Sequence, residues 1–378
     1  MKTRLVNGNV YLNGKFVKTD LTFDKNIISV GCDNSNADKI IDCTDKFITP
    51  GFIDIHIHGR EGFDVTENCK AVAELLPRYG VTSFLPTTLT KSYSDTLKDL
   101  SVLSDYINNQ KSGAEALGIY SEGIFFSKEK CGAQNPENIK VEIDFDFVNK
   151  MLAASGGKLK VMAFAPENKG SAELTVLLKQ KGVRSSMAHT NALESDVEPC
   201  LKNGLDGVTH IYNGMRWMNH LELGASGVGV FNGNLYAELI TDGFHVNKEF
   251  IKILFAVKPI DKILFISDNV PLSGLPEGKS DMFGVPVKIL SDRLEVDNNN
   301  GVYSLAGSCL RLCDSIKNVH AFTGIPYEKL IKCVTENPAE YIGVNDRKGS
   351  IEVGFDSDIN IFDKDFNLIK TFVKGELV

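Results

Sequence analysis

The chain has 378 residues, 43% of them hydrophobic and 24% charged, which is an ordinary composition for a soluble globular enzyme. Its formal net charge of −8 argues against a surface that binds nucleic acid or an anionic membrane. No apolar run approaches the ~18 residues that a membrane span needs, so neither nucleic acid nor a membrane is an expected partner. A chain of this length suits a large domain with a minor one.

The N-terminal stretch is polar and shows no signal-peptide pattern, and the eight cysteines include no Cys-x-x-Cys pair. Without an export signal, reduced thiols are the default state of cysteine. We therefore expect a cytoplasmic protein.

Short strands separated by turns are predicted at both ends of the chain. At the start they cover residues 5–10, 15–23, 26–30 and 39–41, and a similar texture returns at residues 348–354, 358–362 and 371–373. Each group alone is too small to be stable. We therefore expect one β-sandwich domain built from residues 1–50 and 347–378.

Between these ends, strands alternate with helices. Strands are predicted near residues 52–58, 81–86, 117–121, 160–165, 183–188, 206–209, 235–241 and 262–267, and helices at 69–78, 92–109, 172–181 and 192–202. Repeated βα units over residues 51–346 indicate an α/β fold, a TIM-like (β/α)8 barrel. A doubly wound open sheet is the alternative, but no Gly-x-Gly-x-x-Gly follows the first strand.

The first strand of this region carries an unusual polar face. After a Thr-Pro-Gly turn, three isoleucines alternate with Asp54, His56 and His58, so the polar residues share one side of the strand. Burying two imidazoles and a carboxylate without partners costs several kcal/mol. Two imidazoles at this spacing can both reach one metal ion. The alternative is that they are core or surface histidines whose hydrogen bonds are satisfied within the protein.

Other potential ligands follow later strands. His189, His210 and His245 each come at or just past a predicted strand, so five of the chain's seven histidines lie at strand ends. Glu122 and Asp268 end two further strands. Because chemistry in a TIM barrel lies at the C-terminal ends of the strands, this pattern predicts a metal site there.

Several motifs resemble those of a known family. Residues 50–59 resemble the opening motif of the amidohydrolase superfamily. Residues 121–123, 130–136, 163–167, 208–215, 242–246, 267–268 and 305–308 resemble the N-acetylglucosamine-6-phosphate deacetylases, and residues 337–339 and 349–354 match the superfamily's return to its β-sandwich. The resemblance covers nearly the whole chain in the right order.

The resemblance implies that Glu122, His189 and His210 are the primary metal ligands, which suits Zn²⁺ or Fe²⁺. It also implies that a chain with both His56 and His58 binds a second ion bridged by the glutamate, so we expect one or two ions per subunit. Asp268 would be the catalytic carboxylate that takes a proton from water and passes it to the leaving nitrogen. The alternative for Asp268 is an N-cap on the following helix.

The remaining site residues are implied to bind substrate. In the family, such residues contact the sugar phosphate or form the loop over the sugar ring; here they are His245, Asn213, Gly214, Leu305, Ala306 and Gly307. The glycines could instead be ordinary turn residues, and His245 could be a loop histidine facing solvent.

Two positions depart from the family. Gln134 stands where a substrate-holding histidine is usual, and it can donate a hydrogen bond but carry no charge. Leu221 stands where relatives have an arginine that reaches the phosphate across a dimer interface. Arg216 could compensate for that arginine, or be an ordinary surface residue. A homodimer is the expected assembly.

These observations predict a metal-dependent deacetylase that converts N-acetylglucosamine 6-phosphate to glucosamine 6-phosphate and acetate in amino-sugar catabolism. The amino-sugar phosphate would be its only partner besides a second subunit. The departures at Leu221 and Gln134 leave two other substrates open, N-acetylgalactosamine 6-phosphate and an unphosphorylated N-acyl sugar. A non-catalytic scaffold is a third alternative, and the complete ligand set argues against it.

Overall fold

The computed structural model describes residues 1–32, 35–282, 285–296 and 304–378. Nine parallel strands form its central sheet. In ring order these are β6 (Phe52–Ile57), β9 (Val81–Thr88), β11 (Ile119–Glu122), β12 (Leu159–Phe164), β13 (Arg184–Met187), β14 (Gly207–Val208), β15 (Tyr236–Ile240) and β16 (Ile263–Ile266), and the short β10 (Glu115–Ala116) pairs beside β9.

Backbone hydrogen bonds between the first and last strands complete the ring. The Asp268 amide donates to the carbonyl of His56 (3.0 Å), and the His58 amide donates to the carbonyl of Asn269 (2.8 Å). Without β10, the ring contains the eight strands that the sequence predicts. The TIM-like barrel is therefore confirmed, and the doubly wound open sheet is excluded.

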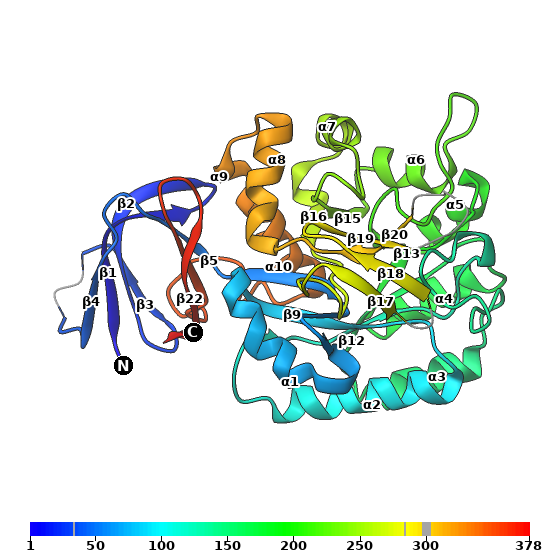
Figure 1. Cartoon of the computed structure of the whole chain (residues 1–378), viewed down its shortest axis with the longest axis horizontal. Helices are drawn as coiled ribbons and strands as arrows, with labels where there is room; N and C mark the ends of the chain where they lie inside the picture. The colour runs from blue at the N-terminus through cyan, green and yellow to red at the C-terminus, as the bar shows by residue number, and fades with distance from the viewer. Residues whose placement is uncertain (33–34, 283–284, 297–303) are drawn as a thin grey trace.

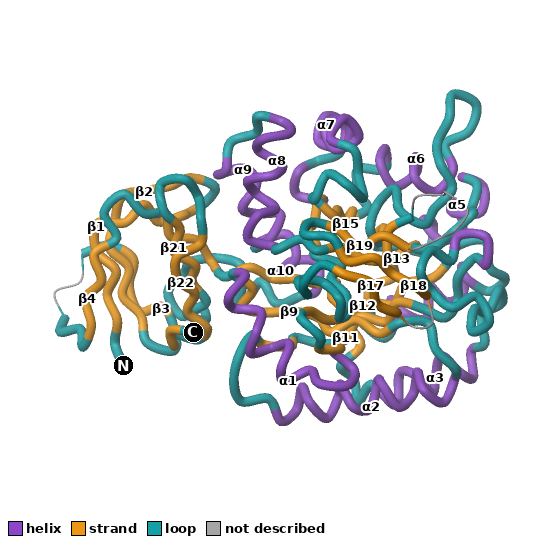
Figure 2. The backbone as a smooth tube through the Cα atoms, viewed as in Figure 1, coloured by secondary structure: helices purple, strands orange, loops and turns teal. Residues whose placement is uncertain are grey.

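Helices surround this ring on the outside (Figures 1 and 2). They are α1 (Val65–Leu75), α2 (Tyr93–Asn109), α3 (Phe145–Ala154), α4 (Ser171–Gln180), α5 (Glu194–Lys202), α6 (Gly224–Phe231), α7 (Lys248–Val257), α8 (Ser315–Thr323), α9 (Tyr327–Leu330) and α10 (Glu336–Ile342). The helices predicted from the sequence correspond to α1, α2, α4 and α5. Within the described ranges, no helix combines the length and the apolar character needed to cross a membrane.

A four-stranded antiparallel sheet interrupts the βα pattern after β16, and the sequence pattern did not predict it. Its strands are β17 (Gly278–Met282), β18 (Val285–Ile289), β19 (Arg293–Val296) and β20 (Leu305–Ser308). It has a small core of its own that includes Val287, Leu294 and Ala306. A two-stranded ribbon, β7 (Gly59–Arg60) with β8 (Phe63–Asp64), follows β6 in a similar way. Both additions lie after the C-terminal ends of barrel strands.

The two ends of the chain meet in one eight-stranded sheet. It contains β1 (Thr3–Leu12), β2 (Lys15–Phe23), β3 (Ile27–Val30), β4 (Lys39–Asp42), β5 (Phe47–Pro50), β21 (Ile359–Phe362), β22 (Leu368–Val373) and β23 (Glu376–Leu377). The N- and C-terminal parts join where β5 pairs antiparallel with β21. Residues 348–354, where strand-like texture was expected, form turns and irregular chain. The domain boundaries at residues 50 and 347 stay a prediction.

A partly buried ionic cluster links the terminal sheet to the barrel, and we call it the junction cluster. Its members are Glu115, Arg347, Lys348, Asp356, Asp358 and Lys374. The Lys348 side chain is 1% exposed, and its Nζ lies 2.8 Å from Glu115, 2.9 Å from Asp356 and 2.6 Å from Asp358. Glu115 belongs to β10, so this lysine fastens the C-terminal part of the chain to the barrel wall.

Candidate metal centre

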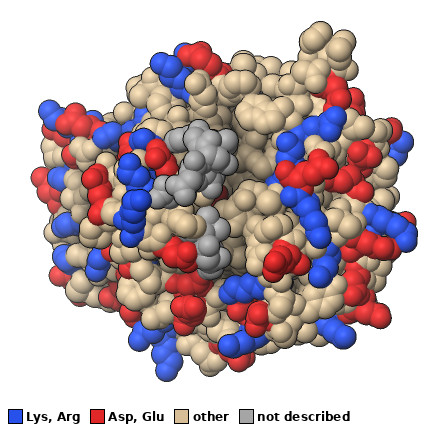
Figure 3. Space-filling view, turned by 45° about the vertical axis from the view of Figure 1, so that its right-hand side comes forward, with Lys and Arg blue, Asp and Glu red and all other residues tan. Residues whose placement is uncertain are grey.

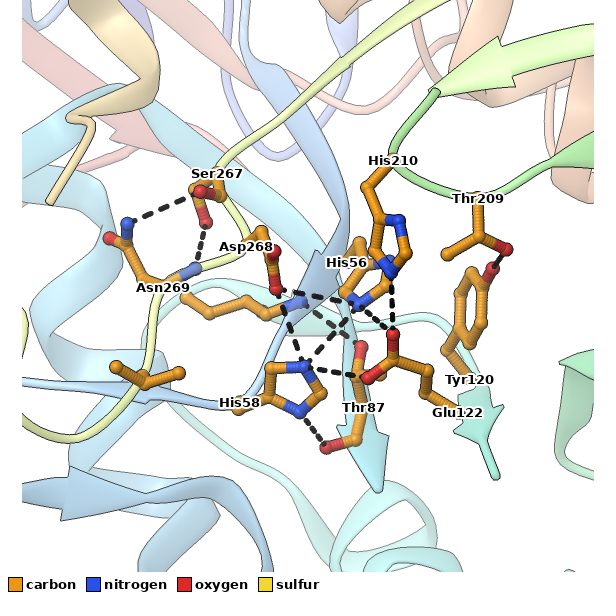
Figure 4. Close-up of polar contacts among 12 residues, drawn as sticks. His56, His58, Thr87, Tyr120, Glu122, Thr209, His210, Ser267, Asp268 and Asn269 are labelled. Carbon is orange, nitrogen blue, oxygen red and sulfur yellow. Dashed lines mark hydrogen bonds and ion pairs between the residues drawn. The ribbon is translucent and has the colours of Figure 1, made fainter. Parts of the chain in front are cut away.

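The C-terminal ends of the barrel strands bring the predicted catalytic side chains together (Figure 4). These side chains are His56, His58, Glu122, His189, His210 and Asp268. Three of them sit on backbone with positive φ, at 42° for His189, 30° for His210 and 49° for Asp268. Such φ values are uncommon for residues with a Cβ and cluster at functional sites. Here each turns the chain sharply just after a strand, which leaves the side chain at the mouth of the barrel.

Glu122, His189 and His210 form the first of two groups, the first triad. Oε1 of Glu122 lies 2.9 Å from Nε2 of His210 and 3.2 Å from Nε2 of His189. The two Nε2 atoms are themselves 3.2 Å apart. All three residues are buried. One oxygen and two nitrogens therefore converge on one point, as the sequence predicts for the primary ligands.

His56, His58 and Asp268 form the second triad. The Nε2 atoms of His56 and His58 lie 3.3 Å apart, and Oδ1 of Asp268 lies 3.6 Å and 3.4 Å from them. Oε2 of Glu122 is 3.2 Å from Nε2 of His58, so this glutamate touches both triads. Asp268, predicted only as the catalytic carboxylate, is thus also placed as a possible ligand.

The donor set fits divalent cations. In each triad two imidazole nitrogens face each other, and only one proton can lie between such a pair. The three potential ligand atoms of each triad lie within 4.8 Å of one another. Imidazole nitrogen and carboxylate oxygen are the donors that Zn²⁺ and Fe²⁺ accept. The residues present could therefore hold one ion in each triad, with Glu122 between them.

The electrostatics of the cluster also favour bound positive charge. Burial would raise the pKa of Glu122, but His56, His189 and His210 outweigh it and hold this pKa well below the ordinary value. For His58, burial would lower the pKa, but Asp268 and Glu122 raise it to about 9. The carboxylates therefore stay ionised, and the imidazoles face a surplus of negative charge that a proton or a metal ion can neutralise.

Further residues hold the ligands in place. His58 Nδ1 lies 3.1 Å from the carbonyl of Thr87, and His189 Nδ1 lies 2.9 Å from the carbonyl of Lys130. His56 Nδ1 instead lies 2.9 Å from a carboxylate, that of Glu238. The sequence reasoning missed Glu238. The available signal was an acidic residue inside the otherwise apolar strand β15, all of which is buried.

Gln134, predicted to bind substrate, has both ends of its amide engaged. Its Nε2 donates to Oε2 of Glu122 (2.8 Å), and its Oε1 accepts from the Thr90 amide (2.8 Å). The residue still lines the cavity described below. The structure thus adds a contact with the candidate metal ligand Glu122 to the predicted substrate role, which stays a prediction.

A cavity of about 410 Å³ opens over the two triads. Figure 3 shows a hollow in the surface, with Lys and Arg side chains on the surface around it. Among the predicted substrate-binding residues, those that line it are Gln134, Asn213, Gly214, His245, Leu305 and Gly307. Trp217 and Met282, which the sequence reasoning did not single out, line it as well.

Two predicted substrate residues are not among the lining residues. Ala306 is fully buried beside the cavity. The Arg216 guanidinium pairs with the carboxylate of Glu222, and its Nη1 lies 3.3 Å from Oδ1 of Asn191. Among the described residues that line the cavity, none is a lysine or an arginine. Nδ1 of His245 lies 2.7 Å from Asp242, so its ring is held from behind.

Comparisons with known proteins agree with this geometry. The amidohydrolase family model matches residues 267–378. The N-acetylglucosamine-6-phosphate deacetylase of Bacillus subtilis is 32% identical over 340 residues, which cover 88% of this chain and 85% of the relative. An Escherichia coli N-acetylgalactosamine-6-phosphate deacetylase is 29% identical, with 88% of each chain covered. The crystal structure of the Thermotoga maritima N-acetylglucosamine-6-phosphate deacetylase superposes with a TM-score of 0.87 over 99% of both chains, at 28% identity.

Proposed function

Since the chain belongs to the amidohydrolases and, within them, to the N-acetylglucosamine-6-phosphate deacetylases, we propose that it hydrolyses N-acetylglucosamine 6-phosphate to glucosamine 6-phosphate and acetate. It is a metal-dependent hydrolase of amino-sugar metabolism. The observation that carries the proposal is the pair of ligand triads around Glu122, set at the mouth of the barrel under a cavity large enough for a sugar phosphate. The order of these residues along the chain is that of the family.

The first triad and the second triad would each hold a divalent ion, for which zinc and iron are the candidates. When bound, such an ion supplies Lewis acidity, which lowers the pKa of water and polarises a carbonyl group. Asp268 lines the cavity beside His58, with 14% of its side chain exposed, so it can accept a proton from a water molecule in the cavity.

Asp268 would then complete the reaction. As water adds to the acetyl carbon, its proton moves to the Asp268 carboxylate. When the C–N bond breaks, that proton passes to the nitrogen, because an amide anion is too basic to leave unprotonated. The products are a free amine and acetate. Asp268 returns to its ionised form, which its histidine neighbours favour by lowering its pKa against the effect of burial.

The phosphate end of the substrate would lie near His245, Asn213 and Gly214, which all line the cavity. The Asp242 carboxylate holds one ring nitrogen of His245 and leaves the other for a ligand. Leu305 and Gly307, in the sheet added after β16, would cover the sugar ring.

We further propose a cytoplasmic homodimer. All eight cysteines are free thiols, which is the expected state in a reducing compartment. Leu221 is 85% exposed and Trp217 is 58% exposed, and both lie in the segment between β14 and α6. Large apolar side chains exposed together suit a contact with a second subunit.

Amine release from a panel of N-acetylated sugars tests the function. We expect turnover of N-acetylglucosamine 6-phosphate, its loss on chelation, and its return when Zn²⁺ or Fe²⁺ is added back. Full activity in the chelated protein would contradict a metal-dependent reaction. No turnover of any N-acetylated sugar by the metal-loaded protein would contradict the deacetylase function itself.

N-acetylgalactosamine 6-phosphate is the second candidate substrate. The E. coli relative named for this epimer is nearly as similar to the chain as the glucosamine-specific ones. The same panel, with both epimers and with unphosphorylated N-acetylglucosamine, separates the candidates by kcat/KM. Equal kcat/KM with and without the phosphate would show that the phosphate contributes nothing to recognition here.

A further inference from the structure

Glu238 is a buried carboxylate that the reaction described above does not use. It lies in the middle of β15 (Tyr236–Ile240) and is 1% exposed. Its Oε2 is 2.9 Å from Nδ1 of His56, which is itself fully buried. Its other oxygen, Oε1, has no hydrogen-bond partner in the described part of the chain. Isolated carboxylates are costly to bury, so this position calls for an explanation.

The contact sets the tautomer of His56. Because a carboxylate only accepts, the Nδ1 atom of His56 must carry the proton. In the neutral ring, the Nε2 atom therefore presents a lone pair toward His58 and Asp268, which is the form that ligates a metal ion. Without this partner the neutral ring could carry its proton on either nitrogen.

His56 differs in this respect from the other histidines of the cluster. His58 and His189 are held by backbone carbonyls, which no side-chain substitution removes. Nδ1 of His210 has no partner among the described residues. Among these four histidines, His56 alone has a charged side chain at its Nδ1 atom. The orientation of the His56 ring and the charge behind it therefore both depend on Glu238.

Charge balance gives Glu238 a second role. Two divalent ions would bring four positive charges into a buried site whose carboxylates in the triads are Glu122 and Asp268. Glu238 adds a third negative charge directly behind His56. A carboxylate placed behind a ligating histidine raises the basicity of the imidazole.

We propose that Glu238 is the positioning residue of the second triad, which holds His56 in the orientation and tautomer that can bind a divalent ion. The inference deepens the proposed function and rests on it only for the assumption that divalent ions bind here. The residue touches neither substrate nor ion, and it acts through the imidazole of His56.

Zn²⁺ titration against a chromophoric chelator tests the proposal on the full-length chain. We expect the native protein to bind two ions. In Glu238→Ala the affinity for one ion should fall about 10- to 100-fold while the other is unchanged, because loss of a partner behind a ligand has effects of this size. Glu238→Gln keeps the shape but loses the charge, and it should fall between the native protein and Glu238→Ala.

A double variant assigns the weakened ion to the second triad. In a His56→Ala background the second ion is already lost, so adding Glu238→Ala should change nothing further. Asp99→Asn serves as the matched control: it alters another buried carboxylate, one paired with Lys91 outside the site, and should leave both affinities unchanged. If Glu238→Ala is too unstable to purify, Glu238→Gln carries the test.

Two outcomes would overturn the proposal. One is unchanged binding of both ions in both variants. The other is equal weakening of both ions, which would mark Glu238 as a general support of the fold. A native protein that binds two ions but releases no amine from any sugar would overturn the proposed function and leave the role of Glu238 intact.

Discussion

Two clusters of charged side chains, one buried and one partly buried, lie near opposite ends of strand β9, and their charges are arranged differently. Near the start of the strand, Ser83 contacts Asp358 of the junction cluster (3.5 Å). Near its end, the carbonyl of Thr87 holds His58 of the second triad. In the junction cluster, carboxylates alternate with ammonium and guanidinium groups, and Lys348 alone touches three of them. In the triads, nitrogen faces nitrogen.

This difference distinguishes charged groups that stabilise the fold from charged groups that are available for chemistry. The junction cluster contains three acidic and three basic side chains, so it satisfies itself. The triads leave their nitrogens and carboxylates aimed at shared points, where an external cation can bind. Breaking the first cluster should therefore affect stability, whereas changing the second should affect chemistry.

The largest expected effect is on turnover. Asp268→Asn keeps the size of the side chain but cannot accept a proton, so kcat should fall by about 10²- to 10⁴-fold. Initial rates of amine release measure this, and metal analysis should show that the first triad keeps its ion. Asp356→Asn, in the junction cluster, is the control and should retain native kcat. A loss of less than about tenfold in Asp268→Asn would assign the proton transfer to another group.

The next effect is on stability. Lys348→Met removes the most buried of the three cations in the junction cluster and leaves the buried carboxylate of Asp358 without its ammonium partner, which should lower the free energy of unfolding by about 3–5 kcal/mol. Denaturant titration measures it. Lys374→Met is the matched control: the side chain of this lysine is 37% exposed and pairs with Glu115 in the cluster, while its backbone amide, which donates to Asp358, is unchanged by the substitution. The free energy of unfolding should therefore fall by no more than about 1 kcal/mol. Similar losses in the two variants would contradict the central role of Lys348.

Acid should weaken the junction cluster. Burial would raise the pKa of Glu115, but Arg347 and Lys348 outweigh it and hold the pKa well below its ordinary value. Its contribution is therefore present above the unfolded pKa, about 4.3, and is lost as pH falls further. A single carboxyl such as that of Glu115 changes the free energy of unfolding by at most about 1.4 kcal/mol per pH unit. Urea titrations between pH 6 and 3, with chelator present throughout, measure the free energy of unfolding at each pH. This free energy should fall less steeply with decreasing pH in Glu115→Gln than in the native protein.

The smallest effect is expected for Arg216. Its guanidinium is already paired with Glu222 and lies outside the set of residues that line the cavity. Arg216→Ala should therefore change KM for the phosphorylated sugar by less than about threefold, as exposed ion pairs contribute little. A rise in KM of about tenfold or more for the phosphorylated sugar, absent for the unphosphorylated one, would identify Arg216 as a phosphate ligand. It would also show that a charge paired within the protein can take part in function.

Much of the barrel could be predicted because its signals are local. The period-two alternation of β6 and the repeated βα texture are properties of neighbouring residues, and they located every strand of the ring to within a few residues. The sequence pattern did not predict the sheet formed by β17–β20, because its short strands and turns resemble a long loop between two expected elements. The sequence also predicts both halves of the terminal sheet. It predicts strand for residues 348–354 as well, but this segment is irregular in the structure, and Lys348 within it pairs with the carboxylates of the junction cluster.

The sequence by itself determined which residue types stand at the strand ends, and the parallel order of the strands then brought the six candidate ligands to one mouth. Only the tertiary structure decided how those ligands are held. Glu238 stands 182 residues after His56, and no local pattern pairs them. Their contact follows from closure of the ring, which places β15 close to β6 in space. For the same reason, only the structure shows that Gln134 contacts Glu122 and that Arg216 pairs with Glu222. The partners of a side chain depend on packing, and packing is a property of the whole fold.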